Sequence, residues 1–355
     1  MCIQEKSYAG LKNGAIRVVS KYKSARHERN EIKMIRFVMP SASLSKELRI
    51  RHLNNQFEEF LNSDVLRQYL DILGVHSTDP SDIHAELQQY NTRQTKNGGI
   101  LESQDAPKHL VLEEKKTELF PYYKEMGLVT INTPQIDSYD RIVVLGGSAN
   151  SNFDKTKTVS RFLNQNVKDV SALACYRPIP PGDRNKTREN HNASDFDTEA
   201  GSFVSAFNKE FNLQEDLDKE VFHFERNINT AYGIRVFNNK SGTRFRVLAA
   251  PGENPTQRPN TYDTCLWYMD DIADNEAAKI LVITNNQYSN FQFLGFSMAI
   301  LERNRNSVDF DIIGCSPDNK LTDEEHYDSN QYFGDIRNTI DWIVKFRNRF
   351  VNPEM

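Results

Sequence analysis

The sequence lacks any long apolar segment. Its 355 residues have a mean hydropathy of −0.65, and no stretch approaches the roughly 18 consecutive apolar residues that a membrane helix requires. The first residues, MCIQEKSYAGLKNGAIRVV, also lack the apolar core of a secretory signal peptide. We therefore expect a cytoplasmic protein without a membrane span.

Cysteine is scarce, with four residues at Cys2, Cys175, Cys265 and Cys315. No pair has the C-x-x-C spacing typical of zinc or redox sites, and three of the four lie inside apolar runs such as SALACYRPI. A reduced thiol in such a run packs as a small hydrophobic group. The cysteines therefore indicate a reducing compartment.

Motifs of the common catalytic and metal sites are missing. The eight histidines are scattered, without the H-x-x-x-H or H-E-x-x-H spacing of a helical metal site. No G-x-S-x-G follows a predicted strand, and neither G-x-G-x-x-G nor G-x-x-x-x-G-K-[ST] occurs. The sequence thus predicts no metal site and carries none of the usual signatures of serine hydrolases or of the commonest nucleotide-binding loops.

Charge is present but unevenly distributed. The net charge is −5, yet residues 1–51 contain twelve Lys or Arg against four Asp or Glu. A basic segment of this kind suits an acidic membrane surface, a nucleic acid or the acidic remainder of the same chain. Its charges are scattered and not interleaved with aromatic residues, which disfavours nucleic acid. We expect it to contact the rest of the protein, with a protein partner as the alternative.

The apolar pattern changes from helical to strand-like near residue 137. Apolar residues at helical spacing predict helices over 43–61, 64–73, 79–90 and 117–126. Residues 1–135 are therefore predicted to form a mostly helical region. Because the pattern changes after it, we expect the chain from about Lys108 onward to retain a folded sheet.

Short apolar runs dominate the second part of the chain. They are DRIVVLGG, VSALACY, FRVLAAPG, KILVITNN and VDFDIIG, and predicted helices lie between them. Strands that alternate with helices and are apolar on both faces indicate parallel βαβ units. We predict a doubly wound α/β domain over 136–355 with a mainly parallel five-stranded sheet. The polar stretch 177–197 is predicted to be a lid or a disordered loop.

The loop after the first predicted strand is a candidate anion site. Open parallel sheets bind ligands beyond the carboxyl ends of their strands. There the sequence VVLGGSANS places Gly146 and Gly147 before Ser148 and Asn150, and Arg177 follows the second strand. Backbone amides at a helix start and a guanidinium both suit a phosphate or carboxylate. The alternatives are a glycine turn required by sterics alone and a surface salt bridge of Arg177.

Further candidates lie at other predicted strand ends. Glu199, in the first turn of a helix, is a candidate general base or an acceptor for a ribose hydroxyl, or a carboxylate favoured there by the helix dipole. Asp263 is a second catalytic candidate. Ligand contacts are predicted for Arg258, Asn260, Thr261, Asn285, Asn286 and Tyr288. An amide-rich loop suits a nucleobase, a sugar or a peptide, although Asn and Ser are also ordinary turn and cap residues.

The segments YD-x-IVVLGG, TEA, RPNTYDT and LVITNNQYSNFQ follow one another in this order over residues 138–315. In this order they resemble the bacterial family of unknown function typified by YdcF, SanA and ElyC. The resemblance implies a Rossmann-like fold and cleft positions for Gly146, Gly147, Glu199, Asn260 and Thr261. One branch of the family is associated with S-adenosylmethionine. This sequence departs from the family pattern at Asp263 and Thr264 and lacks the family's His and Arg after Asn286.

These observations together predict an enzyme of unassigned reaction that binds an anionic, nucleotide-like or cofactor-like small molecule. S-adenosylmethionine or another nucleotide is the candidate cofactor. The LGGS loop and Arg177 would hold the anionic group, and Asn260, Thr261 and Asp263 would orient the reacting part. The alternative is a sensor or effector-type binding module that uses the same cleft without turnover and meets a partner through its basic N-terminal segment.

Overall fold

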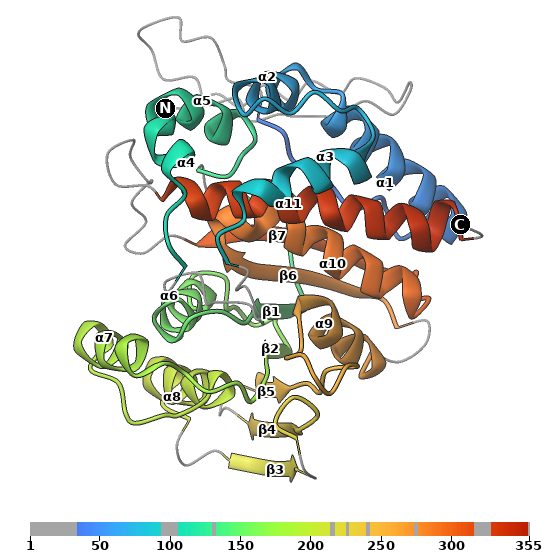
Figure 1. Ribbon diagram of the computed structural model, residues 1–355. Helices are drawn as coiled ribbons and strands as arrows, with labels where there is room; N and C mark the ends of the chain where they lie inside the picture. Colours follow the sequence, from blue (N-terminus) through green and yellow to red (C-terminus); the bar gives the residue numbers. More distant parts are fainter. Residues whose placement is uncertain are drawn as a thin grey trace, which may run out of the picture.

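The computed structural model describes residues 34–93, 106–129, 133–213, 217–224, 227–238, 242–272, 276–315 and 328–353. Its centre is a seven-stranded sheet in the order β3-β4-β5-β2-β1-β6-β7, with helices on both faces (Figure 1). The α/β class expected from the alternating pattern is therefore confirmed. Within the described ranges, no helix is both long enough and apolar enough to cross a membrane.

The five predicted apolar runs form the parallel part of the sheet. They are strands β1 (Arg141–Leu145), β2 (Asp169–Ala174), β5 (Arg244–Ala249), β6 (Ala278–Asn285) and β7 (Val308–Cys315). Each adjacent pair among them runs parallel. Nearly all of their residues are buried, because helices cover both faces.

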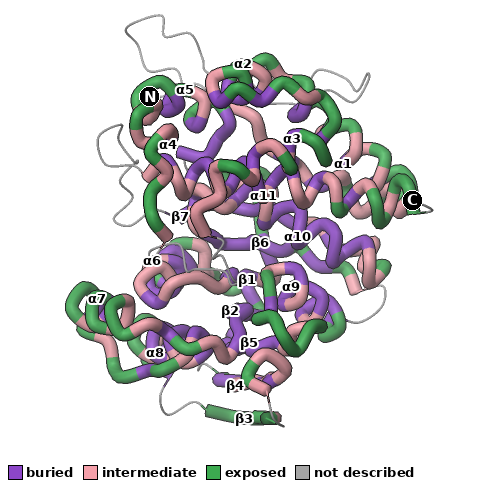
Figure 2. Tube along the Cα trace, in the orientation of Figure 1, coloured by how far each residue is buried: buried purple, intermediate pink, exposed green. Residues whose placement is uncertain are grey.

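The prediction of five strands is wrong, because two antiparallel strands extend the sheet beyond β5. These are β3 (Leu217–His223) and β4 (Tyr232–Asn238). β3 forms the edge and is exposed along almost its whole length (Figure 2). An exposed edge strand mixes charged and apolar residues, as in LDKEVFH, so it lacks the continuous apolar run by which the other strands were recognised.

Two groups of helices cover the sheet. α6 (Ala149–Val159) and α8 (Glu199–Phe211) pack on one face, where Phe203 and Phe207 join the strand residues in one apolar cluster. α9 (Thr261–Asp270), α10 (Ser289–Glu302) and α11 (Ser329–Phe346) belong to the larger cluster on the opposite face. A π-helical turn, Arg347–Val351, follows α11. The three cysteines within the described ranges, Cys175, Cys265 and Cys315, are all buried.

The described residues of the N-terminal region include several helices, which pack on the helices of that larger cluster. Its elements are α1 (Lys46–Leu61), α2 (Asp64–Ile72), α3 (Pro80–Leu87), the 3-10 turn η1 (Gln88–Tyr90), α4 (Leu110–Glu114) and α5 (Lys116–Glu125). The ring centroids of Phe57 and Phe346 lie 5.0 Å apart, and those of Phe37 and Phe293 lie 5.9 Å apart. Both regions therefore share one hydrophobic core.

Most of the basic segment, residues 1–33, lies outside the described residues. In the part that is described, Arg36 and Arg49 contact the sheet domain. Arg49 donates to the carbonyl oxygens of Asn306 (2.9 Å) and Val308 (2.7 Å). Arg36 lies 3.8 Å from the buried carboxylate of Asp311. For the other basic residues of the segment, contact with the same chain or with a protein partner stays a prediction.

The stretch 177–197, for which a lid or a disordered loop was predicted, contains helix α7 (Pro181–His191). Pro181 occupies a first-turn position, where its missing N–H costs no hydrogen bond, and Asn192 ends the helix in the left-handed region at φ 42°. Ion pairs of Arg184 with Asp197 and of Arg188 with Asp195 hold the helix to the segment after it. The helix was not predicted from the sequence because residues 181–191 are almost entirely polar.

Candidate ligand-binding site

A cavity of about 830 Å³ lies at the carboxyl ends of the parallel strands. The residues that follow β1 and β2 and those that end β6 and β7 contribute to its wall. β1 lies between β2 and β6. From β1 the chain continues to β2 on one side, and after β5 it returns to β6 on the other side of β1. This arrangement opens a crevice between the loops of neighbouring strands, which is where open α/β sheets bind ligands.

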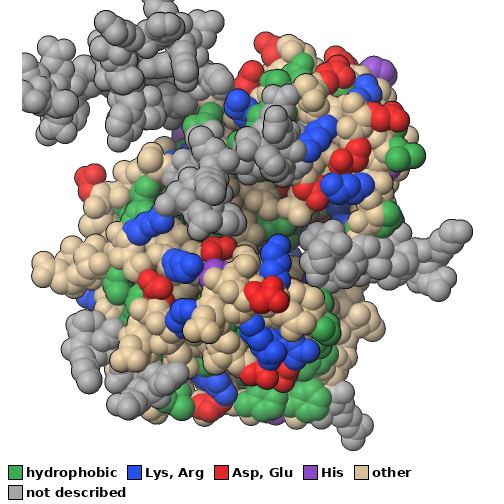
Figure 3. Space-filling model, turned by 90° about the vertical axis from the view of Figure 1, so that its left-hand side faces the viewer, with side chains coloured by type: hydrophobic (Ala, Val, Ile, Leu, Met, Phe, Trp, Pro, Cys, Tyr) green, Lys and Arg blue, Asp and Glu red, His purple; other side chains and the backbone are tan. Residues whose placement is uncertain are grey.

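Both signs of charge line the cavity. Among the described residues the charged lining side chains are Arg93, Lys108, Arg177, Lys186, Arg258 and Arg337, together with Asp154, Asp183, Asp328 and Asp335. The coloured part of the surface in Figure 3 likewise shows Lys and Arg interspersed with Asp and Glu, not a single basic patch. The excess of cations favours an anionic ligand, and the acidic groups add sites for hydrogen-bond donors.

Gly146 and Gly147 follow β1 and allow a close approach of several groups. A Cβ at Gly146 would lie 2.5 Å from Glu199 Oε1 and 2.9 Å from the carbonyl oxygen of Leu173. A Cβ at Gly147 would lie 2.8 Å from Ser151 Oγ. Both glycines line the cavity, and at both positions neighbouring atoms leave little room for a side chain. The steric and the ligand-binding interpretations are therefore compatible.

A buried polar cluster lies behind this glycine turn. Arg177 donates to the carbonyl oxygen of Gly147 at 2.6 Å and to Glu199 Oε1 at 3.3 Å. Glu199 Oε2 accepts from the backbone N–H of Cys175 at 3.2 Å and from its thiol at 3.1 Å. Burial, reinforced by the Glu199 carboxylate, raises the pKa of the Cys175 thiol. The cluster therefore fixes the turn while Arg177 also contributes to the cavity wall.

Lys155 is a buried cation in the same cluster. It donates to the carbonyl oxygen of Leu145, and a Cβ at Gly147 would lie 3.1 Å from its Nζ. Burial lowers the pKa of Lys155 to about 8, although the nearby Cys315 and Glu199 act in the opposite direction. A lysine of this kind indicates a functional region more often than an exposed lysine does. Sequence analysis missed it because a lysine within a helix is expected to face solvent until the neighbouring elements are known.

The N-terminus of α6 is capped from inside the protein. Ser148 Oγ accepts from the backbone N–H of Ser151 at 3.3 Å. Asp183, on α7, accepts from the N–H groups of Ala149 (2.8 Å) and Asn150 (3.5 Å). A carboxylate of the protein thus already lies where the sequence predicted an external anion, and the α7 segment provides it.

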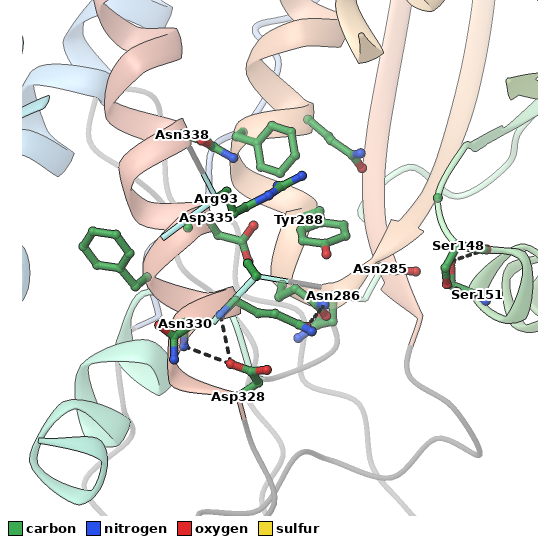
Figure 4. Close-up of a pocket in the computed structure, with 18 of the residues that line it drawn as sticks. Arg93, Ser148, Ser151, Asn285, Asn286, Tyr288, Asp328, Asn330, Asp335 and Asn338 are labelled. Carbon is green, nitrogen blue, oxygen red and sulfur yellow. Dashed lines mark hydrogen bonds between the residues drawn. The ribbon is translucent and has the colours of Figure 1, made fainter. Parts of the chain in front are cut away.

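The loop after β6 supplies the opposite wall of the cavity, and Figure 4 shows several of its side chains. Asn285, Asn286 and Tyr288 all line the cavity. The Asn286 amide also donates to the carbonyl oxygen of Leu128 at 2.7 Å and so ties the loop to the segment after α5. Burial raises the pKa of Tyr288 to about 12, and the carboxyl of Asp335 adds to this rise.

Nine of the thirteen residues predicted from the sequence line this one cavity. They are Gly146, Gly147, Ser148, Asn150, Arg177, Arg258, Asn285, Asn286 and Tyr288. The other four, Glu199, Asn260, Thr261 and Asp263, do not belong to its wall.

Contacts within the protein explain those four positions. Asn260 and Asp263 form a capping box at the start of α9, in which each side chain accepts from the other's backbone N–H. Thr261 Oγ1 lies 3.5 Å from the side-chain nitrogen of Gln292. Both carboxylate oxygens of Glu199 already accept hydrogen bonds within the cluster behind the glycine turn. These contacts favour the structural alternatives given for Glu199 and Asn260.

Sequence analysis also missed the wall formed by the helical elements. Arg93 comes from the segment after η1, Asp328 is the N-cap residue of α11, and Asp335 and Asn338 lie within that helix (Figure 4). Both elements reach the sheet edge through tertiary packing, which no local motif reports. The polar residues of α11 are visible in the sequence, but an amphipathic helix has a polar face whether or not that face lines a cavity.

Among the described residues, no group of three or more His, Cys, Asp or Glu side chains is arranged to hold a metal ion. The chain shows no significant match to a protein-family model, a curated protein or a solved structure. The function is therefore argued from the geometry of the cavity.

Proposed function

We propose that this protein binds an anionic, nucleotide-like small molecule in the cavity at the sheet edge and acts on it as an enzyme of unassigned reaction. S-adenosylmethionine is one candidate ligand, as the resemblance to the YdcF, SanA and ElyC family suggests. The proposal includes a Rossmann-like, doubly wound organisation of the sheet and a cytoplasmic location, in which the buried thiols stay reduced.

One observation carries the proposal: a cavity of about 830 Å³ at the carboxyl ends of parallel strands, lined by six Lys or Arg and four Asp side chains of the described chain. The volume lies within the range of sites for small molecules and cofactors. The buried Lys155 adds a cation behind the glycine turn, where the half-buried Arg177 pairs with Glu199. An anionic group at Gly147 and Ser148 would be stabilised by this charge, beside the N–H groups of Ala149 and Asn150 that already donate to Asp183.

A second candidate function is a sensor that binds the same ligand without turnover. Its support is that neither carboxylate predicted to be catalytic, Glu199 or Asp263, belongs to the cavity wall. Turnover separates the two functions. Incubation with the bound ligand followed by mass spectrometry would detect a product for an enzyme and unchanged ligand for a sensor.

The proposal is tested by mass spectrometry of small molecules released when the purified full-length protein is denatured. We expect an anionic, nucleotide-like compound in stoichiometric amount. A Gly147→Val variant should bind that compound about tenfold more weakly, a loss of about 1.4 kcal/mol, because the added side chain would displace Ser151 and Lys155 at the turn. Binding equal to that of the wild type in a folded variant would exclude ligand contact at this turn.

A further inference from the structure

Asp335 is an unusual component of the cavity wall. The residue is 2% exposed, lies in the first half of α11 and lines the cavity. Its Oδ2 has no hydrogen-bond partner among the described residues. A buried polar atom without a partner costs free energy, and most such atoms in native proteins are satisfied by protein, water or ligand. Its position in a cavity wall makes a ligand the natural partner.

Burial favours the neutral form of this carboxyl. Burial raises the pKa of Asp335 well above its usual range, although the nearby guanidinium groups of Arg337 and Arg93 oppose the rise. Tyr288 is the third titratable group close to it (Figure 4). A neutral carboxylic acid presents one O–H donor beside one carbonyl acceptor. It therefore complements a ligand edge that has an acceptor beside a donor.

Aromatic side chains line the same cavity. They are Tyr90, Tyr288, Phe291 and Phe333. Rings of this kind bind flat heterocycles by stacking, which contributes affinity without selecting one heterocycle over another. In Figure 4, Asp335, Arg93 and Tyr288 lie together on the side of the cavity away from Ser148 and Ser151. The wall is thus aromatic and hydrogen-bonding at one end and suited to an anion at the other.

We propose that Asp335 recognises the edge of an amino-substituted nitrogen heterocycle, such as adenine, in which an exocyclic amino group adjoins a ring nitrogen. The carboxylic O–H donates to the ring nitrogen, and Oδ2 accepts from the amino group. This inference rests on the proposed function, since the anionic group of the same ligand lies at the Gly147–Ser148 end. It specifies the ligand class as an adenine-type nucleotide or nucleoside cofactor.

The test uses the full-length protein and three probes measured by isothermal titration calorimetry. The probes are adenosine 5′-monophosphate, purine riboside 5′-monophosphate, which lacks the amino group, and ribose 5-phosphate, which lacks the base. In the wild type, we expect each removal to weaken binding, the loss of the amino group by about tenfold because Oδ2 again lacks a partner.

Three variants assign the effect to Asp335. Asp335→Asn keeps a donor beside an acceptor and should bind adenosine 5′-monophosphate within about threefold of the wild type. Asp335→Leu removes both groups and should weaken binding about tenfold or more, and it should no longer distinguish the two nucleotides. Asp341→Asn is the matched control, because it removes a carboxylate from the same helix at a position outside the cavity wall. It should bind like the wild type.

Each other result overturns the inference in a recognisable way. Wild-type affinity in a folded Asp335→Leu variant would show that Asp335 does not contact the base. Equal loss in Asp335→Asn and Asp335→Leu would show that an ionised carboxylate is needed, contrary to the donor–acceptor pair. If ribose 5-phosphate bound as tightly as the nucleotide, recognition of the base would be excluded, whereas the proposed anion site would remain supported. Binding of none of the probes would contradict both this inference and the proposed function.

Discussion

Lys155 is a residue of the candidate site whose pKa is lowered by burial. Its side chain is buried behind Gly147, and burial lowers its pKa from 10.5 to about 8. The folded protein therefore binds fewer protons than the unfolded chain between these two values. By linkage, stability rises with pH across this interval and the contribution is lost as pH falls through about 8.

We predict that Lys155→Met removes this pH dependence. Between pH 8 and 10.5 the wild type should gain roughly 2–3 kcal/mol of unfolding free energy relative to the variant. Urea denaturation at several pH values measures the difference. Lys157→Met, on the exposed side of the same helix, is the control and should follow the wild type. Parallel curves for wild type and Lys155→Met would show that Lys155 titrates normally in the folded state.

Alanine substitutions at the glycine turn should have unequal costs. A Cβ at Gly146 meets the backbone carbonyl of Leu173 at 2.9 Å, whereas a Cβ at Gly147 meets only the side-chain ends of Ser151 and Lys155. Backbone cannot move away as a side chain can. We expect Gly146→Ala to lower the unfolding free energy by about 2–3 kcal/mol and Gly147→Ala by less than about 1 kcal/mol. Equal melting temperatures for the two variants would contradict this account of the turn.

Single residues were predictable where their role is local. Gly146, Gly147 and Ser148 follow an apolar strand and precede a helix, so their position at the sheet edge followed from sequence order. Lys155 and Asp335 were not recognised, because a Lys or Asp in a helix reads as solvent-facing until its neighbours are known. Their burial depends on elements that lie far away in the sequence.

At the scale of elements, capping explains residues that sequence analysis assigned to the ligand. Asn260 Oδ1 accepts from the N–H groups of Tyr262 at 2.7 Å and Asp263 at 3.2 Å at the start of α9. Neither Asn260 nor Asp263 belongs to the cavity wall. The local pattern N-x-x-D was visible in the sequence, but it fits a capping box as well as a polar binding loop.

Asn260→Ala should therefore reduce stability and leave ligand binding unchanged. Loss of the cap costs about 1 kcal/mol, which thermal denaturation would show as a lower melting temperature. Asn260→Ser retains a capping oxygen and should restore most of the loss. If Asn260→Ala instead weakened binding at unchanged stability, the side chain would belong to the ligand site after all.

The predictability of elements followed their burial. β1, β2, β5, β6 and β7 are covered on both faces and were recognised as continuous apolar runs. β3 and β4 were missed because an edge strand and its neighbour carry mixed sequences such as LDKEVFH and YGIRVFN. Helix α7 was missed because a polar helix held by ion pairs has no apolar periodicity to detect.

At the scale of the whole molecule, the N-terminal helices and the sheet domain depend on each other. Leu53 and Phe57 of α1 lie in the same apolar cluster as Phe293 and Phe346. The pattern change near residue 137 marks a change of secondary structure but not an independent core. Sequence periodicity reports what each element buries, and it does not report which element covers it.

Removal of residues 1–107 should therefore prevent cooperative folding, contrary to the expectation from the sequence pattern. The truncation exposes apolar surfaces of α10 and α11 that Phe37, Phe57 and α3 now cover, and each exposed leucine or phenylalanine costs about 1.5–3 kcal/mol. Circular dichroism during urea denaturation would follow the transition. A sharp cooperative transition of the shortened chain would show that the sheet domain folds alone.

The central claim is that the cavity at the sheet edge is the ligand site, and Gly334 offers the most direct test. This residue of α11 lines the cavity, and a Cβ built on it meets nothing within 4 Å. A Gly334→Trp side chain should occupy the cavity without disturbing the fold, whereas Gly334→Ala should leave the space open and act as the control. Affinity for the ligand released from the wild-type protein would be measured for both variants by calorimetry. The account predicts wild-type affinity for Gly334→Ala and about tenfold or greater loss for a folded Gly334→Trp, and undiminished binding by folded Gly334→Trp would contradict it.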